Sequence, residues 1–323
     1  MLNPPTVSVI VCAYTEDRWS LVVNCIASLE VQTAPPIEII LCIDHNENLL
    51  RKSKQYFGQE RPAGAIPLTV VGNKYDGRLG SARNTAAEIA SGDVLAFLDD
   101  DAAAAADWLE QLIAPYSDPR VAAAGGAPLP VFERRRPRWF PLEFDWVFGC
   151  AYSGLPLVRA ELAHLIGANM SVRRSALLEI NGFHSDNHDD MDMCLRLAFA
   201  QYKVIYEPRA IVEHFVPATR TTWHYFWRRC YFVNLGKVAA FANMQDAAHL
   251  GAEVAFVGRI IMKGIPAGMR QTVRGDWYGL VRVSVMMAGI VLAGLGHLSG
   301  RFQVRRMRRP AVAVMPIGSA ENP

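Results

Sequence analysis

The sequence lacks closely spaced cysteines. Its six cysteines are scattered over 323 residues, and no CxxC pattern occurs. This spacing indicates neither a zinc site nor a disulfide framework, so we expect reduced thiols, mostly in the core, in a cytosolic setting. The first apolar run, at residues 7–13, is short and has no basic flank, so we interpret it as a strand and not as a signal peptide.

Long apolar runs are also scarce. One stretch, residues 283–298, is apolar except for Ser284 and His297, and several arginines follow it. Crossing a bilayer takes about 20 apolar residues, so a buried core helix, a re-entrant segment and an interfacial anchor all stay open. The arginines favour a membrane-associated helix with its basic end on the cytoplasmic side.

The chain has little net charge, but the charge is unevenly distributed. The total is +2, whereas residues 251–323 hold ten basic and three acidic residues, a net charge of +7, which leaves −5 for residues 1–250. A basic tail on a mildly acidic body predicts attraction to an anionic surface. Because the apolar run adjoins these charges, we expect a membrane surface as the partner and no nucleic acid.

The first half of the chain alternates between strand and helix patterns. Apolar runs at 7–13, 37–43, 68–72, 94–98 and 121–126 are typical of strands buried on both faces of a parallel sheet. Helical patterns at 21–29, 47–56, 81–90 and 107–116 separate them. The series predicts an α/β fold with a Rossmann-like, mostly parallel sheet flanked by helices, whose ligand crevice lies at the carboxyl ends of the strands.

A basic and aromatic connection at residues 132–159 interrupts this alternation. It carries arginines at 134–136 and the large side chains of Trp139, Phe140 and Trp146. A long loop in a compact domain is more often functional than not. The aromatic side chains are expected either at a membrane interface or acceptor site, or packed against the sheet.

Shorter elements resume after this connection. We expect strands at 169–172, 204–206 and 211–214, helices at 175–180 and 190–201, and a helical chain after residue 221. The sequence therefore predicts a ligand-binding domain over residues 1–220 and a C-terminal helical region with a basic tail over residues 221–323.

Three consecutive carboxylates, Asp99, Asp100 and Asp101, follow the expected strand at 94–98. They would repel one another at the mouth of the crevice unless a cation such as Mg²⁺ or Mn²⁺ neutralised them together with diphosphate oxygens. The alternative is a solvated helix start, where acids are also favoured. An EF-hand is excluded, since Ala103 and Ala104 stand where a ligand and the turn glycine belong.

Two further positions suggest a nucleotide ligand. Asp44 ends the second expected strand, where its carboxylate is placed to accept a hydrogen bond from a nucleobase or to cap the next helix. The stretch GRLGSARN at 77–84 opens a helix and contains Arg83, a combination that suits phosphate.

An acidic cluster begins the helix expected at 190–201. Asp189, Asp190 and Asp192 lie at its start, where one or two of them would serve as caps and one as a general base. His184 and His188 nearby leave a second metal site as an alternative.

Together these motifs resemble glycosyltransferase family 2, which has the GT-A fold. VSVIVCAYTEDR, CIDHNEN, GSARN, GDVLAFLDDD, GANMSVRR, NGFH and DDMDMCLR occur in the family's order. More narrowly, DHNENLL, DDDAAAAADWLEQL, PRWFPLEFDWVFGCAYSG, IGANMS and FWRRCY look like a subgroup of glucosyl-dolichyl-phosphate glucuronosyltransferases. This resemblance implies an inverting transferase with a GT-A catalytic domain over residues 1–220. It implies a UDP-sugar donor, with UDP-glucuronate as the candidate, and a polyprenyl-phosphate-linked or other glycan acceptor.

The resemblance also implies roles for single residues. Ala13, Tyr14 and Glu16 would border the nucleobase, Asp44 would contact uracil, and Arg83 and Asp100 would lie near the nucleotide. Asp99 and Asp101 would be metal ligands for Mn²⁺ or Mg²⁺, with His214 as an extra ligand or, alternatively, a core histidine. Asp190 would be the catalytic base beside Asp189. The enzyme would work at the cytoplasmic face of the cell membrane, peripherally or with one C-terminal segment.

The sequence departs from the subgroup at two places and leaves rival functions to consider. Val233 and Asn234 follow FWRRCY where glutamate and glycine are usual, and the acidic helix carries aspartates where glutamates are common, which bears on the acceptor. No QxxRW element occurs, so we expect transfer of a single sugar. CAYTEDR has no glycine, which argues against a nucleotidylyltransferase; a metal phosphohydrolase and a non-catalytic, membrane-bound nucleotide-binding module remain as alternatives.

Overall fold

Four parallel strands form the first half of the sheet. The computed structural model describes residues 4–58, 64–76, 78–184, 188–242 and 250–307. Within them the order β3-β2-β1-β4 is parallel throughout, and each strand reads as a continuous apolar run in the sequence. The strands are β1 (Val7–Ala13), β2 (Glu38–Ile43), β3 (Leu68–Gly72) and β4 (Val94–Asp99).

The second half of the sheet is mixed. β8 (Asn169–Arg173) lies antiparallel between β4 and β6 (Val121–Phe132), and β9 (Lys203–Val216) runs parallel to β6. β5 (Ala102–Ala104) and β7 (Ala160–Glu161) pair antiparallel with β9, which completes nine strands in the described chain. The α/β sheet flanked by helices is confirmed; the sheet is mixed, with the parallel block β3-β2-β1-β4 and a second parallel pair, β6 and β9. The strands expected at 204–206 and 211–214 belong to one strand, β9, whose pairing with β6 shifts register between Tyr206 and Ile211, around Pro208.

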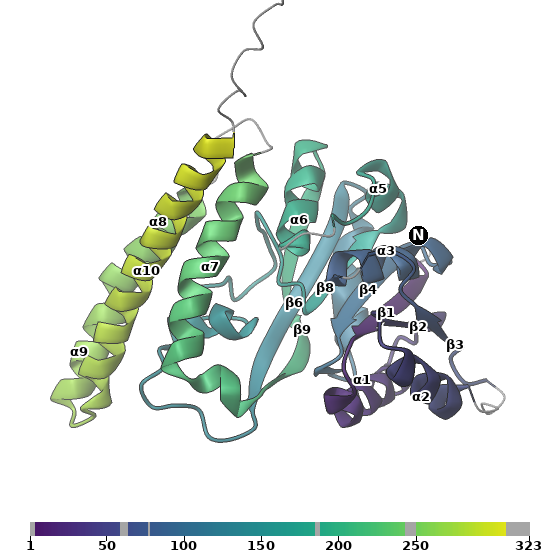
Figure 1. The fold of residues 1–323 in the computed structure, drawn as a ribbon, viewed down its shortest axis with the longest axis horizontal. Helices are drawn as coiled ribbons and strands as arrows, with labels where there is room; N and C mark the ends of the chain where they lie inside the picture. The colour runs from purple at the N-terminus through teal and green to yellow at the C-terminus, as the bar shows by residue number, and fades with distance from the viewer. Residues whose placement is uncertain (1–3, 59–63, 77, 185–187, 243–249, 308–323) are drawn as a thin grey trace, which may run out of the picture.

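Helices cover both faces of the sheet (Figure 1). One apolar cluster joins the sheet to three helices, α1 (Trp19–Glu30), α2 (Glu47–Phe57) and α4 (Trp108–Ile113). A second cluster joins the opposite face to α3 (Leu79–Ile89), α5 (Arg174–Glu179) and α6 (Asp189–Phe199). Short helical turns η1 (Glu16–Arg18), η2 (Ala114–Ser117), η3 (Leu142–Phe148) and η4 (Ala218–Thr221) connect these elements. The six cysteines are free thiols, five of them buried, as expected.

Helices make up most of the described chain after residue 221, as predicted, and form a layer beside the sheet (Figure 1). Its elements are α7 (Trp223–Ala242), α8 (Leu250–Arg259), the π-helix η5 (Ile260–Gly264), α9 (Ile265–Val273) and α10 (Tyr278–Met307). Within the described chain α10 is the one helix long and apolar enough to cross a bilayer, and 28% of that apolar stretch is buried. The last arginines of the basic tail, Arg308 and Arg309, lie outside the described residues.

A third apolar cluster ties this layer to the connection at 132–159. Phe140, Phe144 and Phe148 pack against Phe226 of α7 and Met286 of α10. The packing alternative therefore holds for Phe140, which is 2% exposed, and Trp139 and Trp146 are partly buried against the same cluster.

Three glycines allow α10 to approach its neighbours closely. A Cβ at Gly289 would lie 2.4 Å from the Phe144 ring, and one at Gly296 would lie 2.1 Å from the carbonyl oxygen of Tyr231. At Gly300 the carbonyl oxygen of Leu235 would be 2.7 Å away. The contact between α7 and α10 is therefore one of backbone against backbone.

Candidate active site

The three consecutive aspartates lie at the carboxyl end of β4, in the crevice of the sheet. Asp100 and Asp101 are buried, at 3% and 4% exposed, and Asp99 is half-buried. β5 follows them directly, and α4 begins only after Asp107. The alternative of a solvated helix start therefore does not hold. Buried carboxylates need hydrogen-bonding or charged partners, and the sheet alone does not supply them.

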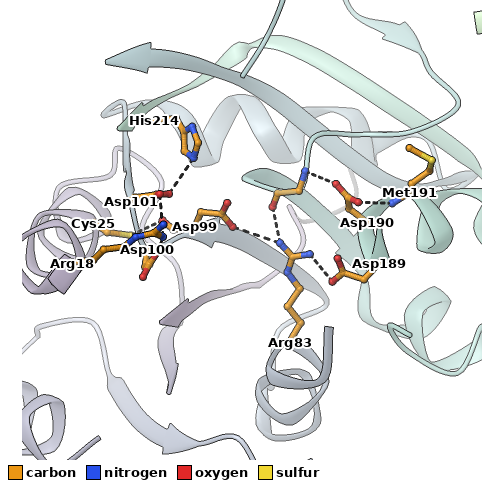
Figure 2. Close-up of polar contacts among 11 residues, drawn as sticks. Arg18, Cys25, Arg83, Asp99, Asp100, Asp101, Asp189, Asp190, Met191 and His214 are labelled. Carbon is orange, nitrogen blue, oxygen red and sulfur yellow. Dashed lines mark hydrogen bonds and ion pairs between the residues drawn. The ribbon is translucent and has the colours of Figure 1, made fainter. Parts of the chain in front are cut away.

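An arginine and a histidine partner the buried carboxylates (Figure 2). Nη1 of Arg18, in the turn after β1, lies 2.8 Å from Oδ1 of Asp100 and 3.1 Å from Oδ2 of Asp101. Nε2 of His214, near the end of β9, lies 3.1 Å from Oδ1 of Asp101, and Arg220 is 3.6 Å from Oδ2. The other oxygen of Asp100, Oδ2, is buried without a hydrogen-bond partner in the described residues.

Burial and charge act in opposite directions on these groups. Burial raises the pKa of Asp100 to about 7, although Arg18 beside it favours the ionised form. Burial also raises the pKa of Asp99, which Arg83 offsets only in part. For Asp101 the burial is outweighed by the hydrogen bond and charge of His214 and by the two arginines, so its pKa is lowered.

Asp99, Asp101 and His214 form a set that fits a divalent cation. One ligand atom from each lies within 4.8 Å of the other two. Two carboxylates and an imidazole suit Mn²⁺, and carboxylates also suit Mg²⁺. Burial and the neighbouring Asp101 raise the pKa of Asp99, and a cation would favour its ionised form. The imidazole of His214 is 2% exposed and held from behind by Cys150, whose Sγ lies 3.3 Å from Nδ1.

Arg83 links the metal-type cluster, formed by Asp99, Asp101 and His214, to the start of α6 (Figure 2). Its Nη1 donates to Oδ2 of Asp189 at 2.9 Å, and its Nη2 donates to the carbonyl oxygen of Gly167 at 2.9 Å and lies 3.6 Å from Asp99. The side chain is 2% exposed. Burial lowers the pKa of Arg83, but the carboxylates of Asp189 and Asp99 outweigh it and the net shift is upward. Its charge is thus already matched by protein groups.

Asp190 lies on the other side of Gly167. Its Oδ2 accepts a hydrogen bond of 3.0 Å from the Gly167 amide, and its Oδ1 accepts one of 2.8 Å from the amide of Met191 in the first turn of α6. The backbone amide of Gly167 thereby orients Asp190, while the carbonyl oxygen of the same residue binds Arg83. The two carboxylates of the acidic pair have separate partners.

The histidines of the acidic cluster do not gather around a metal. Nδ1 of His184 lies 2.9 Å from Oδ2 of Asp192, which also receives Arg196. His188 begins α6 in a left-handed conformation and packs against Gly236 of α7, where an added Cβ would lie 2.5 Å from its Nε2. Residues 185–187 of this motif lie outside the described chain.

The positions expected to border a nucleobase come together at the ends of β1 and β2. The amide of Asp44 donates to the carbonyl oxygen of Ala13, and Oδ1 of Asp44 accepts from Asn73 at 2.8 Å. Asn46, and not Asp44, caps α2. Tyr14 and Glu16 are exposed beside them.

Residues 8–180 match the family model "Glycosyl transferase family 2". The chain belongs to glycosyltransferase family 2. This family 2 glycosyltransferase is 30% identical over 243 residues to the glucosyl-dolichyl phosphate glucuronosyltransferase of Haloferax volcanii, covering 72% of this chain and 76% of that one. It is 23% identical to the succinoglycan biosynthesis protein ExoM of Rhizobium meliloti, covering 68% and 70%.

Solved structures share the fold. The mannosyltransferase PcManGT of Pyrobaculum calidifontis, in complex with GDP-Man and Mn²⁺, superposes with a TM-score of 0.59 at 19% identity, over 91% of this chain and 87% of that one. GalNAc-T7 with UDP, GalNAc and Mn²⁺ gives a TM-score of 0.53 at 18% identity, over 77% and 52%. The expected GT-A fold is thereby confirmed for this family 2 enzyme.

Four residues of the glycosyltransferase site were not expected from the sequence. Arg18 belongs to CAYTEDR. Its position directly after the first expected strand is a signal from which it could have been placed in the crevice. Asn73 follows β3 in the same way. Arg220 and the backbone of Gly167 carry no such signal, since their contacts with Asp101 and Arg83 arise from distant parts of the chain.

Proposed function

We propose that this enzyme transfers one sugar from a UDP-sugar to a polyprenyl-phosphate-linked acceptor with inversion at the anomeric carbon. The observation that carries the proposal is the placement of a metal-type cluster and a separately oriented carboxylate on the two sides of Arg83 (Figure 2). A leaving diphosphate and an attacking hydroxyl need these two environments in one crevice.

The chemical step is a single displacement. Asp190 accepts the proton of the acceptor hydroxyl while that oxygen forms a bond to the anomeric carbon. The bond from the anomeric carbon to the diphosphate oxygen breaks, and UDP leaves with the electron pair. The hydrogen bonds from the amides of Gly167 and Met191 fix the orientation of the Asp190 carboxylate. General-base action of this kind contributes about 10²–10⁴-fold.

Asp99, Asp101 and His214 would hold Mn²⁺ or Mg²⁺. A cation held there would neutralise charge on the diphosphate, an interaction of about 4 kcal/mol per pair of unit charges 4 Å apart at an effective dielectric near 20. Arg18 and Arg220 keep the cluster compact when negative charge accumulates there. The nucleobase would lie between Tyr14 and Asp44, beside Ala13 and Glu16, with Arg83 and Asp100 behind the diphosphate.

The names of the relatives support the substrate classes. The Haloferax volcanii protein is named for a dolichyl-phosphate-linked acceptor and a glucuronosyl group, which favours UDP-glucuronate as donor here. Both structural neighbours were solved with Mn²⁺ and a nucleotide or nucleotide sugar. The apolar helix α10 supports work at the cytoplasmic face of the membrane, peripherally or with one segment inserted.

The test is UDP release by the purified protein with Mn²⁺ over a panel of UDP-sugars, with and without a polyprenyl-phosphate-sugar. We expect acceptor-dependent release from one donor. Release of inorganic phosphate without an acceptor would instead establish a phosphohydrolase. UDP binding without release from any donor would establish a binding module.

A further inference from the structure

A cavity of about 530 Å³ lies between the catalytic half and the C-terminal helices. Asp190 of α6 and His188 just before it line one part, Trp146 of η3 and residues between 149 and 166 line another, and α7, α8 and α10 complete the described lining. This volume is within the range of ligand sites, about 300–1,000 Å³. The cavity therefore reaches the carboxylate that we propose as base.

The walls of this cavity are apolar where they lie on the C-terminal helices. Phe256 and Val257 of α8 and Ile290 and Ala293 of α10 face it. A hydroxyl-bearing sugar alone would leave these side chains uncovered, whereas a hydrocarbon chain would cover them. The walls favour an acceptor that carries an apolar chain.

Basic side chains of the same cavity suit a phosphate. Arg229, Val233 and Lys237 of α7 line it at intervals of four residues, so both cations lie on one helix face. Nε of Arg229 donates to the carbonyl oxygen of Val147 at 3.3 Å, and within the described chain Arg229 forms no ion pair with a carboxylate. Among the described residues of the lining, Asp190 is the one acidic side chain, so basic side chains outnumber acidic ones there.

An exposed apolar stripe leads from the surface to this cavity. Met287, Val291, Leu295, Leu298 and Phe302 recur at helical spacing along α10 and are 45–63% exposed. Leu298 belongs to the stripe and also lines the cavity. A chain lying along the stripe thus has a continuous apolar path towards Asp190.

From these contacts we infer that the cavity is the acceptor site for a lipid-linked phosphate, with its hydrocarbon chain against α8 and α10 and its phosphate at Arg229 and Lys237. This inference rests on the proposed function for the role of Asp190. It adds the residues that select the acceptor, and it commits to a polyprenyl-phosphate-linked sugar, the acceptor of the proposed function, as the occupant.

The first test measures transfer kinetics with a polyprenyl-phosphate-sugar. Arg229→Gln and Lys237→Gln should each raise the KM for this acceptor about tenfold or more and leave the KM for the UDP-sugar unchanged. Arg229→Lys should recover part of the loss. Arg228→Gln is the matched control, because Arg228 is exposed on α7 beside Phe232 and does not line the cavity. Equal effects of Arg228→Gln and Arg229→Gln would overturn the assignment, as would equal use of a chainless sugar phosphate.

The second test needs no turnover and so separates this inference from the proposed function. Polyprenyl phosphate in detergent should quench the tryptophan fluorescence of the protein, and Trp146→Phe should remove most of the quenching. Ala293→Trp should fill the cavity and abolish lipid binding while UDP still binds. Competition by phosphatidylglycerol at equal concentration, or binding unaffected by Ala293→Trp, would contradict the acceptor site even in a protein that transfers no sugar.

Discussion

The two sides of the crevice are built from different materials. On the proposed donor side, strand ends from the parallel half of the sheet place Asp99, Asp100 and Asp101 among arginines and His214. On the proposed acceptor side, helices of the C-terminal layer line a cavity with apolar side chains and two basic ones, and Asp190 lines it too. In the proposed arrangement, one carboxylate lies between a charged region that suits a nucleotide and an apolar region that suits a lipid.

The strongest test of this division removes the group between the two sides. Asp190→Asn should reduce turnover by about 10²–10⁴-fold, because an amide cannot accept the hydroxyl proton. Binding of UDP with Mn²⁺, measured by calorimetry, should stay unchanged. Asp192→Asn is the matched control in the same helix turn, since Asp192 faces His184 and Arg196. A near-normal rate for Asp190→Asn would contradict its assignment as base.

Changes on the donor side should affect nucleotide binding and not acceptor binding. EDTA should abolish turnover and Mn²⁺ should restore it. Asp101→Asn should lower turnover by on the order of 10²-fold because one charged ligand near the diphosphate is lost. The affinity for UDP with Mn²⁺ should fall with it, whereas the lipid-induced fluorescence change should persist. Asp93→Asn provides the control, because the Asp93 carboxylate is exposed and is hydrogen-bonded to Thr6. Full activity in EDTA would contradict the metal site.

Changes on the exposed apolar stripe of α10 should weaken attachment to a bilayer. A double substitution, Leu295→Lys with Phe302→Lys, should lower binding to anionic vesicles about tenfold in a flotation assay, since each lysine adds a desolvation cost. Leu157→Lys is the control, because Leu157 is 93% exposed and lies outside the C-terminal layer. Equal losses for both proteins would argue against α10 as the membrane contact.

The smallest effect on the reaction is expected from a substitution at the contact between α10 and α7. Gly296→Ala should lower the free energy of unfolding by about 1–3 kcal/mol, because its Cβ meets the backbone of Tyr231. Gly294→Ala, with no atom within 4 Å, should leave it unchanged or raise it by up to about 1 kcal/mol through helix propensity. Thermal unfolding of the two variants measures the difference. A stable Gly296→Ala protein would show that α7 and α10 separate readily.

The sequence predicts the strands of the proposed donor side better than it predicts the cavity of the proposed acceptor side. The strands β1 to β4 were predictable because burial on both faces leaves continuous apolar runs, and the aspartates after β4 marked the crevice. The strand β8 was also expected, but its antiparallel direction was not, because a five-residue strand pattern does not record direction within a sheet. Likewise the ion pair of Arg83 with Asp189 joins residues 106 positions apart, so the sequence around one residue does not predict the other as its partner.

The C-terminal helices were predicted as helices, but their cavity was not. Arg229 and Lys237 look like ordinary surface cations in the sequence, and only the approach of α7 to His188 at Gly236 brings them near Asp190. The roles of the site residues remain predictions, which the experiments above decide.

The close approach of α10 at Gly289, Gly296 and Gly300 has a consequence for reach. At Gly296 and Gly300 the close approach is to the backbone of α7, and at Gly289 it is to the Phe144 ring, so α10 is packed tightly against its neighbours. With α10 seated in a bilayer, as proposed, the depth of the helix sets the height of Asp190 above the lipid headgroups. An acceptor whose hydroxyl lies at that distance from the bilayer can reach the carboxylate, and one whose hydroxyl lies farther from or closer to the bilayer cannot. The distance from the bilayer would then select acceptors before any side chain contacts the sugar.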